Sequence, residues 1–263
     1  MTATIDETVR IHSTAKIAAN VIIGPWVFIG KNVEIGEGNR IDSHAVISKN
    51  TVLGKNNHIH SHAAIGGDPQ DLSYRDEETF LTIGDHNIVR EFVTLNRGTK
   101  NGGGITQIGN KNFFMSYSHV AHDCHVGNET LFINNASIAG HVTVDDFAIM
   151  GAYSAAHQFS HIGAYSFLAH AAQISQDVPP YMLVKGIPGV PTALNIVGLR
   201  RRGFSNETIS GLKKAFKIMY HEHLSLVEMT KALEILSIQI PEVQLILKLM
   251  HDSKRGIVRR QSD

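Results

Sequence analysis

An aliphatic residue recurs at every sixth position over most of this chain, and no other feature restricts the fold so strongly. The first run has eleven members without a miss: Ile5, Ile11, Ile17, Ile23, Ile29, Ile35, Ile41, Ile47, Leu53, Ile59 and Ile65. The register resumes over 83–95 and again over 108–174. A period of six fits neither an α-helix nor an alternating strand. It is the period of a hexapeptide β-helix, in which each hexad forms one flat side of a coil and its aliphatic residue points inward.

Two stretches interrupt the repeat, at 68–80 and at about 98–107. A regular coil has no place for either of them, so we predict that both project from the β-helix as loops. Tolerated insertions would explain each one alone. Loops on a rigid scaffold commonly carry binding and catalytic residues, however, so we expect function near them.

The period changes beyond about Pro191. Ser205 precedes apolar residues at helical spacing, and Ser225 and Glu228 have the spacing of a capping box. Pro241 fits the first turn of a further helix. We predict a β-helix domain over 1–190 and a small α-helical domain over 191–263.

The charges of the chain balance, with 24 Lys and Arg against 24 Asp and Glu. No overall field therefore attracts nucleic acid or a membrane surface. The one cysteine cannot form an internal disulfide, and the N-terminus lacks the basic and apolar regions of a signal peptide. No window approaches the roughly 18 apolar residues of a membrane span. We predict a cytoplasmic protein that binds no nucleic acid and inserts in no membrane.

Three histidines fall on one strip of the predicted β-helix. A coil of three hexads has about 18 residues, so His122, His141 and His157 lie near one another on successive coils. None holds an inward aliphatic place, so we expect them outside. Three interpretations stay open: contacts to a neighbouring chain, a metal site, and a general base oriented by Asp123. Cys124 falls on an inward position for a small residue, which favours packing over a nucleophilic role.

Short motifs spread over nearly the whole chain narrow these alternatives. In order they are QDL (70–72), RGT (97–99), GGG (102–104), HVAHDCHVGN (119–128), AGHVTVDDFAI (139–149), HQF (157–159), QDVPPY (176–181) and GLRRRGFS (198–205). In this ordered set the chain resembles the UDP-N-acetylglucosamine acyltransferases, the enzymes of the first step of lipid A synthesis. Hexads alone would also fit other acyltransferases or an inert spacer.

The resemblance implies a homotrimer of left-handed parallel β-helices with active sites in the clefts between subunits. It implies transfer of a 3-hydroxyacyl chain from the thioester of acyl carrier protein to the glucosamine 3-OH of UDP-N-acetylglucosamine, with no metal and no cofactor. His122 would be the general base, Asp123 would orient it, and the N–H of Gly140 would stabilise the oxyanion.

The resemblance also assigns substrate-binding positions. They are Gln70, Asp71, His119, His141, His157 and Gln158 along the sugar and acyl sites, Asn195 and Arg201 at the UDP end, and His170 at the closed end of the acyl groove.

Two positions depart from the family pattern. Ser73 stands where the family commonly has a lysine, and Asn96 where it commonly has a histidine. Both would face the nucleotide sugar, so acylation of a 3-amino sugar to an amide is an alternative. His170 stands where other members have glycine and should shorten the acyl groove. A zinc hydratase like the γ-class carbonic anhydrases and a non-catalytic β-helical assembly module are further alternatives.

Overall fold

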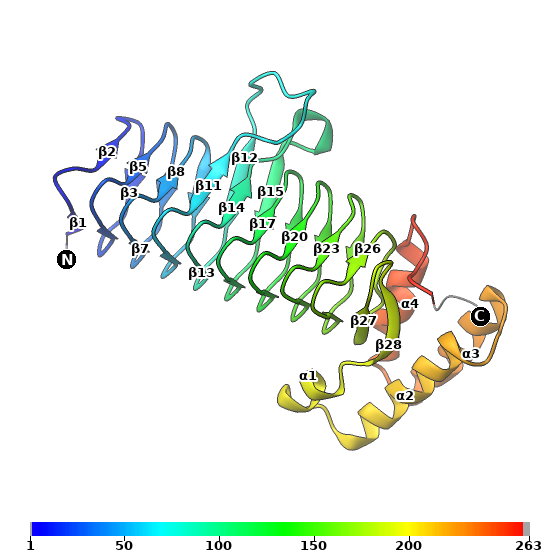
Figure 1. Cartoon of the computed structure of the whole chain (residues 1–263). Helices are drawn as coiled ribbons and strands as arrows, with labels where there is room; N and C mark the ends of the chain where they lie inside the picture. The colour runs from blue at the N-terminus through cyan, green and yellow to red at the C-terminus, as the bar shows by residue number, and fades with distance from the viewer. Residues whose placement is uncertain (1, 260–263) are drawn as a thin grey trace.

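The computed structural model describes residues 2–259, and most of them form a three-sided prism of stacked coils. Figure 1 shows the prism running from the N-terminus to a small group of helices at its far end. Each side is a sheet of short strands. Neighbouring strands within a side are parallel, except that β28 is antiparallel to β27.

The strands of each side follow one another at intervals of one coil. Side one contains β1 (Thr4–Ile5), β4 (Ile22–Ile23), β7 (Arg40–Ile41), β10 (His58–Ile59), β13 (Ile88–Val89), β16 (Phe113–Phe114), β19 (Leu131–Phe132), β22 (Ile149–Met150), β25 (Phe167–Leu168), β27 (Met182–Lys185) and β28 (Val190–Leu194). Side two contains β2 (Arg10–Ile11), β5 (Phe28–Ile29), β8 (Val46–Ile47), β11 (Ala64–Gly67), β14 (Thr94–Asn96), β17 (His119–Val120), β20 (Ser137–Ile138), β23 (Ala155–Ala156) and β26 (Gln173–Ile174). Side three contains β3 (Lys16–Ile17), β6 (Glu34–Ile35), β9 (Thr51–Leu53), β12 (Phe80–Ile83), β15 (Ile105–Ile108), β18 (His125–Val126), β21 (Thr143–Val144) and β24 (His161–Ile162).

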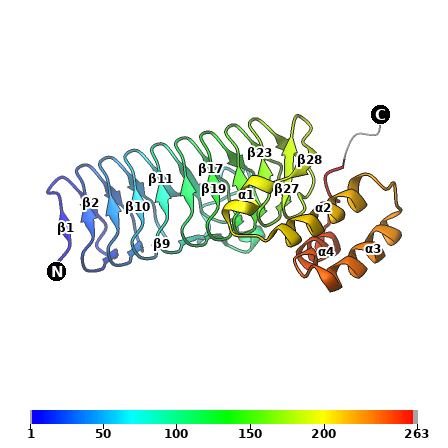
Figure 2. The ribbon, with the colours of Figure 1, turned by 90° about the horizontal axis from the view of Figure 1, so that it is seen from below.

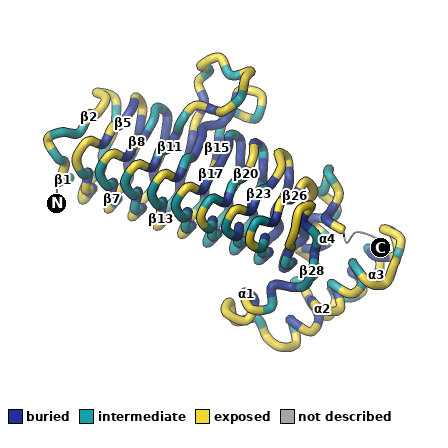
Figure 3. The backbone as a smooth tube through the Cα atoms, viewed as in Figure 1, coloured by how far each residue is buried: buried dark blue, intermediate teal, exposed yellow. Residues whose placement is uncertain are grey.

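The aliphatic residue of each hexad points into the prism and forms the core. Ile29, Ile65 and Val120 are fully buried, and Figure 3 shows buried residues along the prism from the second coil onward. The first coil is the exception, because no further coil covers it. Ile5 is 41% exposed and Ile11 is 38% exposed. The predicted core is confirmed everywhere except at this open end.

The three corners between the sides carry different residues, and we number them. Corner 1 joins side one to side two, for example at 42–45. Corner 2 joins side two to side three, for example at 121–124, and corner 3 joins side three to side one, for example at 145–148. Asp123 and His141, one coil apart at corner 2, both have left-handed backbone angles, with φ of 59° and 62°. Residues one coil apart therefore occupy equivalent positions of the corner and have similar backbone angles.

Both predicted loops leave the prism at corner 2. The first loop, 68–79, joins β11 to β12, and the second loop, 97–104, joins β14 to β15 and contains the 3-10 helix η1 (Lys100–Gly102). Figure 1 shows them projecting together from the middle of the prism. The loops are slightly shorter than predicted, because Phe80 and Gln107 already pair within side three.

Four helices within residues 2–259 follow the prism: α1 (Ile196–Arg201), α2 (Asn206–Tyr220), α3 (Leu226–Gln239) and α4 (Val243–Asp252). Ser205 caps α2, and Ser225 with Glu228 forms the predicted capping box of α3. The prediction for Pro241 is wrong, because Glu242 is the N-cap of α4 and Pro241 precedes it. Helix α1 is too short for its apolar residues to show a helical period in the sequence.

Figure 2 shows from below the helices at the end of the prism. Hydrogen bonds attach them to it. The hydroxyl of Tyr181 donates to the carbonyl of Glu242 at 3.0 Å, and the hydroxyl of Ser253 donates to the carboxylate of Asp177 at 2.5 Å. The division of the chain at 190 stays a prediction. None of the described helices is long and apolar enough to cross a membrane.

Candidate active site

His122 and Asp123 lie at corner 2, directly beside the second loop. Nδ1 of His122 is 2.8 Å from Oδ2 of Asp123. The His122 side chain is 13% exposed, and the Asp123 side chain is not exposed at all. Neighbours in the sequence are therefore in direct contact, which the sequence could not establish.

The carboxylate of Asp123 is held by the second loop. The backbone N–H of Thr99 donates to Oδ1 at 2.8 Å, and the hydroxyl of Thr99 donates to Oδ2 at 2.6 Å. Burial by itself would raise the pKa of Asp123, but hydrogen bonds from His122 and Thr99 outweigh it and hold the pKa below its ordinary value. Asp123 is therefore a carboxylate at neutral pH.

These contacts decide which nitrogen of His122 carries the proton. A carboxylate accepts hydrogen bonds and donates none, so Nδ1 of His122 carries the hydrogen that binds Asp123. Nε2 then has a free lone pair and can accept a proton from a hydroxyl group. An orienting carboxylate fixes a catalytic histidine in the same way in serine hydrolases.

Gly140 lies against the ring of His122. A Cβ atom added at Gly140 would be 2.5 Å from Cε1 and 2.7 Å from Nε2 of His122. Only glycine leaves room for the ring in this position. The N–H of Gly140 donates no hydrogen bond to another described residue, so it is available to a ligand beside His122.

His141 stands one coil beyond Asp123. Its ring meets the ring of His122 edge-on with centroids 5.2 Å apart, and it stacks on Phe159 at 4.4 Å. Burial lowers the pKa of His141, although the negative charge of Asp123 acts in the opposite direction. His141 is therefore neutral at neutral pH and offers hydrogen bonds, not a positive charge.

His119 lies on β17, the strand that leads into this corner. Nδ1 of His119 is 2.7 Å from the hydroxyl of Thr94. Burial lowers the pKa of His119, a hydrogen bond from its ring to the backbone of Thr94 opposes that change, and repulsion from His122 adds to it. This ring is neutral as well.

The first loop brings Asp71 towards the same corner. The backbone N–H and hydroxyl of Ser73 donate to Asp71 at 2.8 and 2.9 Å. These hydrogen bonds, and in smaller part attraction from His122, hold the pKa of Asp71 below its ordinary value. Ser73 is exposed, as expected for a residue that faces a ligand, but it also fixes the Asp71 carboxylate. Gln70 is exposed beside it.

Asn96 does not face a ligand site, and that prediction is wrong. Its side chain is buried and its amide donates to the carbonyl of Asp68 at 2.9 Å. The neighbouring Arg97 is also buried, and its guanidinium binds the carbonyl of Gly66, the carboxylate of Asp68 and the hydroxyl of Tyr74. Through these contacts, both side chains anchor the base of the first loop.

His157 and Gln158 lie at corner 2 on the coil after His141, and both are exposed. Nδ1 of His157 is 3.1 Å from the carbonyl of Gln158. Neither side chain touches His122 within the chain. The predicted strip is therefore present, but its direct contacts stop at His141.

Three predicted residues lie away from this corner. His170 is at corner 1, with its ring 5.7 Å from that of Tyr153. Asn195 is buried as the N-cap of α1, where it accepts from Gly198 and donates to the carbonyl of Tyr165. Arg201 ends α1 and is exposed. A single chain does not bring these residues to His122.

Sequence reasoning missed the residues that position Asp123. Thr99 supplies two donors, and the hydroxyl of Thr106 accepts from the N–H of Asp123 at 2.8 Å. A Cβ atom added at Gly102 would lie 2.1 Å from the Asp123 carboxyl carbon, so the loop needs glycine there. The motifs RGT and GGG contained the signal, but only the fold shows what they contact.

A metal ion fits this corner poorly. His122, Asp123 and His141 have ligand atoms within 4.8 Å of one another, which metal sites can use. Both oxygens of Asp123 already accept hydrogen bonds, however, and the carboxylate is fully buried. A cation would have to break these bonds. The arrangement favours the base over the zinc site.

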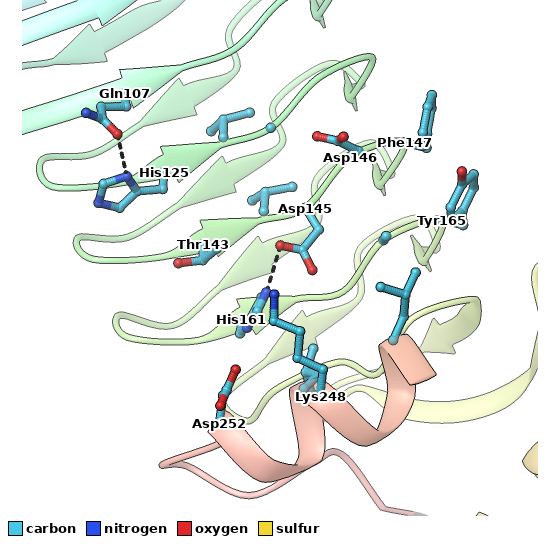
Figure 4. A pocket seen from close by; sticks show the side chains of 16 residues that line it. Gln107, His125, Thr143, Asp145, Asp146, Phe147, His161, Tyr165, Lys248 and Asp252 are labelled. Carbon is cyan, nitrogen blue, oxygen red and sulfur yellow. Dashed lines mark hydrogen bonds and ion pairs between the residues drawn. The ribbon is translucent and has the colours of Figure 1, made fainter. Parts of the chain in front are cut away.

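A cavity of about 510 Å³ lies elsewhere, between side three and α4. Figure 4 shows two hydrogen-bonded pairs among its polar residues. Nδ1 of His125 is 3.0 Å from Oε1 of Gln107, and Nε2 of His161 is 2.9 Å from Oδ1 of Asp145. None of the predicted site residues lines it. We assign it no part in the chemistry at corner 2.

Known proteins match this chain over nearly its whole length. A family model described as Udp N-acetylglucosamine O-acyltransferase, Domain 2, matches residues 177–258, and a model of the GMPPB C-terminal domain matches 5–70. A protein of Pseudomonas entomophila is 42% identical over 98% of this chain and 100% of its own length. It is named acyl-acyl-carrier-protein–UDP-N-acetylglucosamine O-acyltransferase. A protein of the same name from Thiobacillus denitrificans is 43% identical over the same shares.

Solved structures agree with this. The UDP-N-acetylglucosamine acyltransferase of Francisella novicida superposes with a TM-score of 0.96 at 38% identity, over 98% of this chain and 95% of that one. LpxA of Acinetobacter baumannii gives a TM-score of 0.94 at 40% identity, over 97% and 99%. The predicted fold, a left-handed parallel β-helix with a small helical end, is confirmed.

Proposed function

The chain belongs to the UDP-N-acetylglucosamine O-acyltransferase family, and we propose that it moves a 3-hydroxyacyl chain from acyl carrier protein to the glucosamine 3-OH of UDP-N-acetylglucosamine. This is the first step of lipid A biosynthesis. The observation that carries the assignment to corner 2 is the His122–Asp123 contact beside the free N–H of Gly140. We keep the expectation of a cytoplasmic enzyme as part of the proposal.

The mechanism needs one base and one oxyanion donor. Nε2 of His122 takes the proton of the 3-OH as its oxygen attacks the thioester carbonyl. The N–H of Gly140 stabilises the negative oxygen of the tetrahedral intermediate. The intermediate then expels the thiolate of acyl carrier protein, and the imidazolium returns its proton to that sulfur. The products are the sugar ester and the free thiol.

The alternatives are less well supported. The relatives are named as O-acyltransferases, which favours the 3-OH acceptor over a 3-amino acceptor, and none of the relatives given above is named as a hydratase. The burial of Asn96 removes one of the two substitutions on which the amide alternative depended.

We also propose a homotrimer whose clefts combine two subunits. The predicted residues divide into a set at corner 2 and a set formed by His170, Asn195 and Arg201, and these sets do not meet within one chain. Leu72, on the first loop beside Asp71, is 99% exposed, so in the proposed trimer it is free to contact a neighbouring subunit. In such an assembly, the first loop would reach the second set.

Mixed subunits test this arrangement. Co-expressed His122→Ala and Arg201→Ala chains should form trimers in which some clefts have both residues intact. Equal amounts assembling at random would restore about a quarter of the wild-type sites. Each variant alone should stay inactive, and no recovery in verified mixed trimers would contradict the shared cleft.

His170 is our proposal for the residue that limits acyl length. Its imidazole is exposed at corner 1, where it can face a neighbouring subunit. His170→Gly should shift the preferred donor to a longer chain when acyl carrier proteins of several lengths compete. An unchanged preference would refute this assignment.

The reaction itself is tested by mass spectrometry of nucleotide products. The enzyme is incubated with UDP-N-acetylglucosamine and mixed 3-hydroxyacyl carrier proteins, and an acylated nucleotide is expected. His122→Ala should lower its rate by about 10² to 10⁴-fold, the usual range for a general base. The exposed His12→Ala, far along the prism, is the matched control and should act like wild type. No product from wild type would overturn the proposal, and a 3-amino nucleotide that turned over faster would revive the amide alternative.

A further inference from the structure

A second cluster of two histidines and an aspartate lies on the N-terminal half of the prism, away from corner 2. Asp42 follows β7, and His58 and His60 belong to the next coil at β10. The ligand atoms of the three side chains lie within 4.8 Å of one another. All three are half-buried, with 33% of His58 and 21% of both His60 and Asp42 exposed.

One oxygen of Asp42 faces both imidazoles. Oδ2 is 2.8 Å from Nε2 of His58 and 3.4 Å from Nδ1 of His60. The other oxygen, Oδ1, accepts from Nε of Arg40 at 2.8 Å, which fixes the orientation of the carboxylate. The two rings are stacked with their centroids 3.8 Å apart. The two nitrogens and one oxygen thus lie close together, and the stacked rings turn apart for both nitrogens to face one ion.

We propose that Asp42, His58 and His60 bind a zinc-class divalent metal ion. Two imidazoles with one carboxylate suit Zn²⁺, Co²⁺ or Ni²⁺ and do not suit Mg²⁺ or Ca²⁺, which prefer oxygen ligands. Ligands placed tetrahedrally at about 2.05 Å from zinc are about 3.4 Å apart, which is the observed His60–Asp42 separation. The His58–Asp42 pair needs to open by only about 0.6 Å.

Glu91, on the following coil, lies beside this set. Oε1 of Glu91 is 3.7 Å from Nδ1 of His60. Glu91 is bound by Arg90 and by the hydroxyl of Ser116, so its carboxylate is fixed. A metal held by Asp42, His58 and His60 would join two successive coils. The site is therefore structural, a clip across coils that pack only through short strands.

The Asp42 cluster is partly exposed to solvent, whereas Asp123 at corner 2 is buried. Arg40 binds the carboxylate of Asp42, and Arg90 binds that of Glu91. Each carboxylate keeps surface exposed to solvent, with 21% for Asp42 and 32% for Glu91. A metal ion would replace the hydrogen bond between His58 and Asp42, whose side chains are both partly exposed.

The test measures zinc bound to untagged full-length protein. Metal-free protein is equilibrated with micromolar Zn²⁺, freed of excess ion and analysed by mass spectrometry for metal. We expect one zinc per wild-type chain, nearly none in His60→Gln, and one in His141→Gln, the matched change at corner 2. Co²⁺ should give the visible absorption of a tetrahedral ion in wild type and lose it in His60→Gln.

Thermal unfolding supplies a second readout. Zinc should raise the melting temperature of wild type and of His141→Gln but not that of His60→Gln. If His60→Gln does not fold, Asp42→Asn, which keeps the shape of the side chain, takes its place. No zinc on wild type, or equal zinc on wild type and the corner 1 variants, would overturn the site.

Discussion

The prism carries two clusters of two histidines and one aspartate, and they differ in how the aspartate is held. At corner 2 the Asp123 side chain is fully buried, and both its oxygens accept hydrogen bonds from Thr99 or His122. At corner 1 the Asp42 side chain is 21% exposed, its Oδ1 accepts from Arg40, and its Oδ2 is 2.8 Å from Nε2 of His58. The same three residue types thus make a fixed base at one corner and an open ligand set at the other.

The difference comes from the second loop. A regular coil leaves its corner exposed to water, as at Asp42, whereas residues 97–104 fold over Asp123 and exclude water. Repeats therefore supply similar places, and insertions decide which of them becomes a closed site. Substitutions in the loop residues that cover Asp123 should therefore remove the difference between corner 2 and corner 1.

The largest effect is expected for Gly140→Ala. The added Cβ would lie 2.5 Å from the His122 ring, so the ring must move by about an ångström, and a displacement of that size can cost about 10²-fold in rate. The measurement is kcat/KM with a melting curve to show that the fold persists. Activity within threefold of wild type would show that the ring position is not critical.

A smaller effect is expected for Thr99→Val, which removes the hydroxyl donor but keeps the shape. A hydrogen bond to a charged group contributes about 1.5 to 3 kcal/mol, so kcat/KM should fall by about tenfold or more. The Thr99 hydroxyl helps to hold the pKa of Asp123 low, so its loss should raise that pKa. The acidic limb of the kcat/KM profile should then move to higher pH.

Thr106→Val is the matched control for this experiment. Thr106 accepts from the backbone N–H of Asp123 and does not touch its carboxylate. Its loss should lower stability and leave the acidic limb in place. Equal shifts of the limb in both variants would mean that the Thr99 hydroxyl acts only through the fold.

The smallest effect concerns acid stability. Burial lowers the pKa of His119, so as pH falls through the ordinary histidine range the unfolded chain gains a proton before the folded chain does. Stability should fall there, with a limit of about 1.4 kcal/mol per pH unit for one group, and should level off below the folded pKa.

Urea unfolding at about pH 7.5 and 5.5 measures this, on either side of the ordinary histidine pKa. His119→Gln should lose less stability between these values than wild type. His157→Gln, which changes an exposed ring, should behave like wild type. Identical losses in all three proteins would show that the partly buried ring of His119 carries no such cost.

The sequence predicted the periodic part of the molecule because each hexad repeats one physical requirement, an inward aliphatic residue. It also located both loops, since they break that requirement. It did not place Asn96, whose amide anchors the first loop, because a polar residue at a break can face either inside or out. It missed Thr99 because its contact with Asp123 joins residues of different coils.

The motifs predict which residues belong to the site, but they do not show which of those residues contact one another. His122 and Asp123 are neighbours in the sequence, yet their contact depends on the corner geometry and on the loop above it. His170 and Arg201 belong to other parts of the chain surface, and no pattern within one chain gives their distance from His122. Residues that meet only across subunits stay beyond single-chain reasoning.

The central claim is that buried Asp123 holds the proton of His122 on Nδ1 and leaves Nε2 as the base. Nitrogen-15 NMR of histidine-labelled protein measures this directly, with His122→Gln used to assign the signals. The account predicts that at neutral pH Nδ1 of His122 carries the hydrogen and Nε2 does not. A hydrogen found on Nε2 instead would mean that His122 cannot take the hydroxyl proton there, and the account would be contradicted.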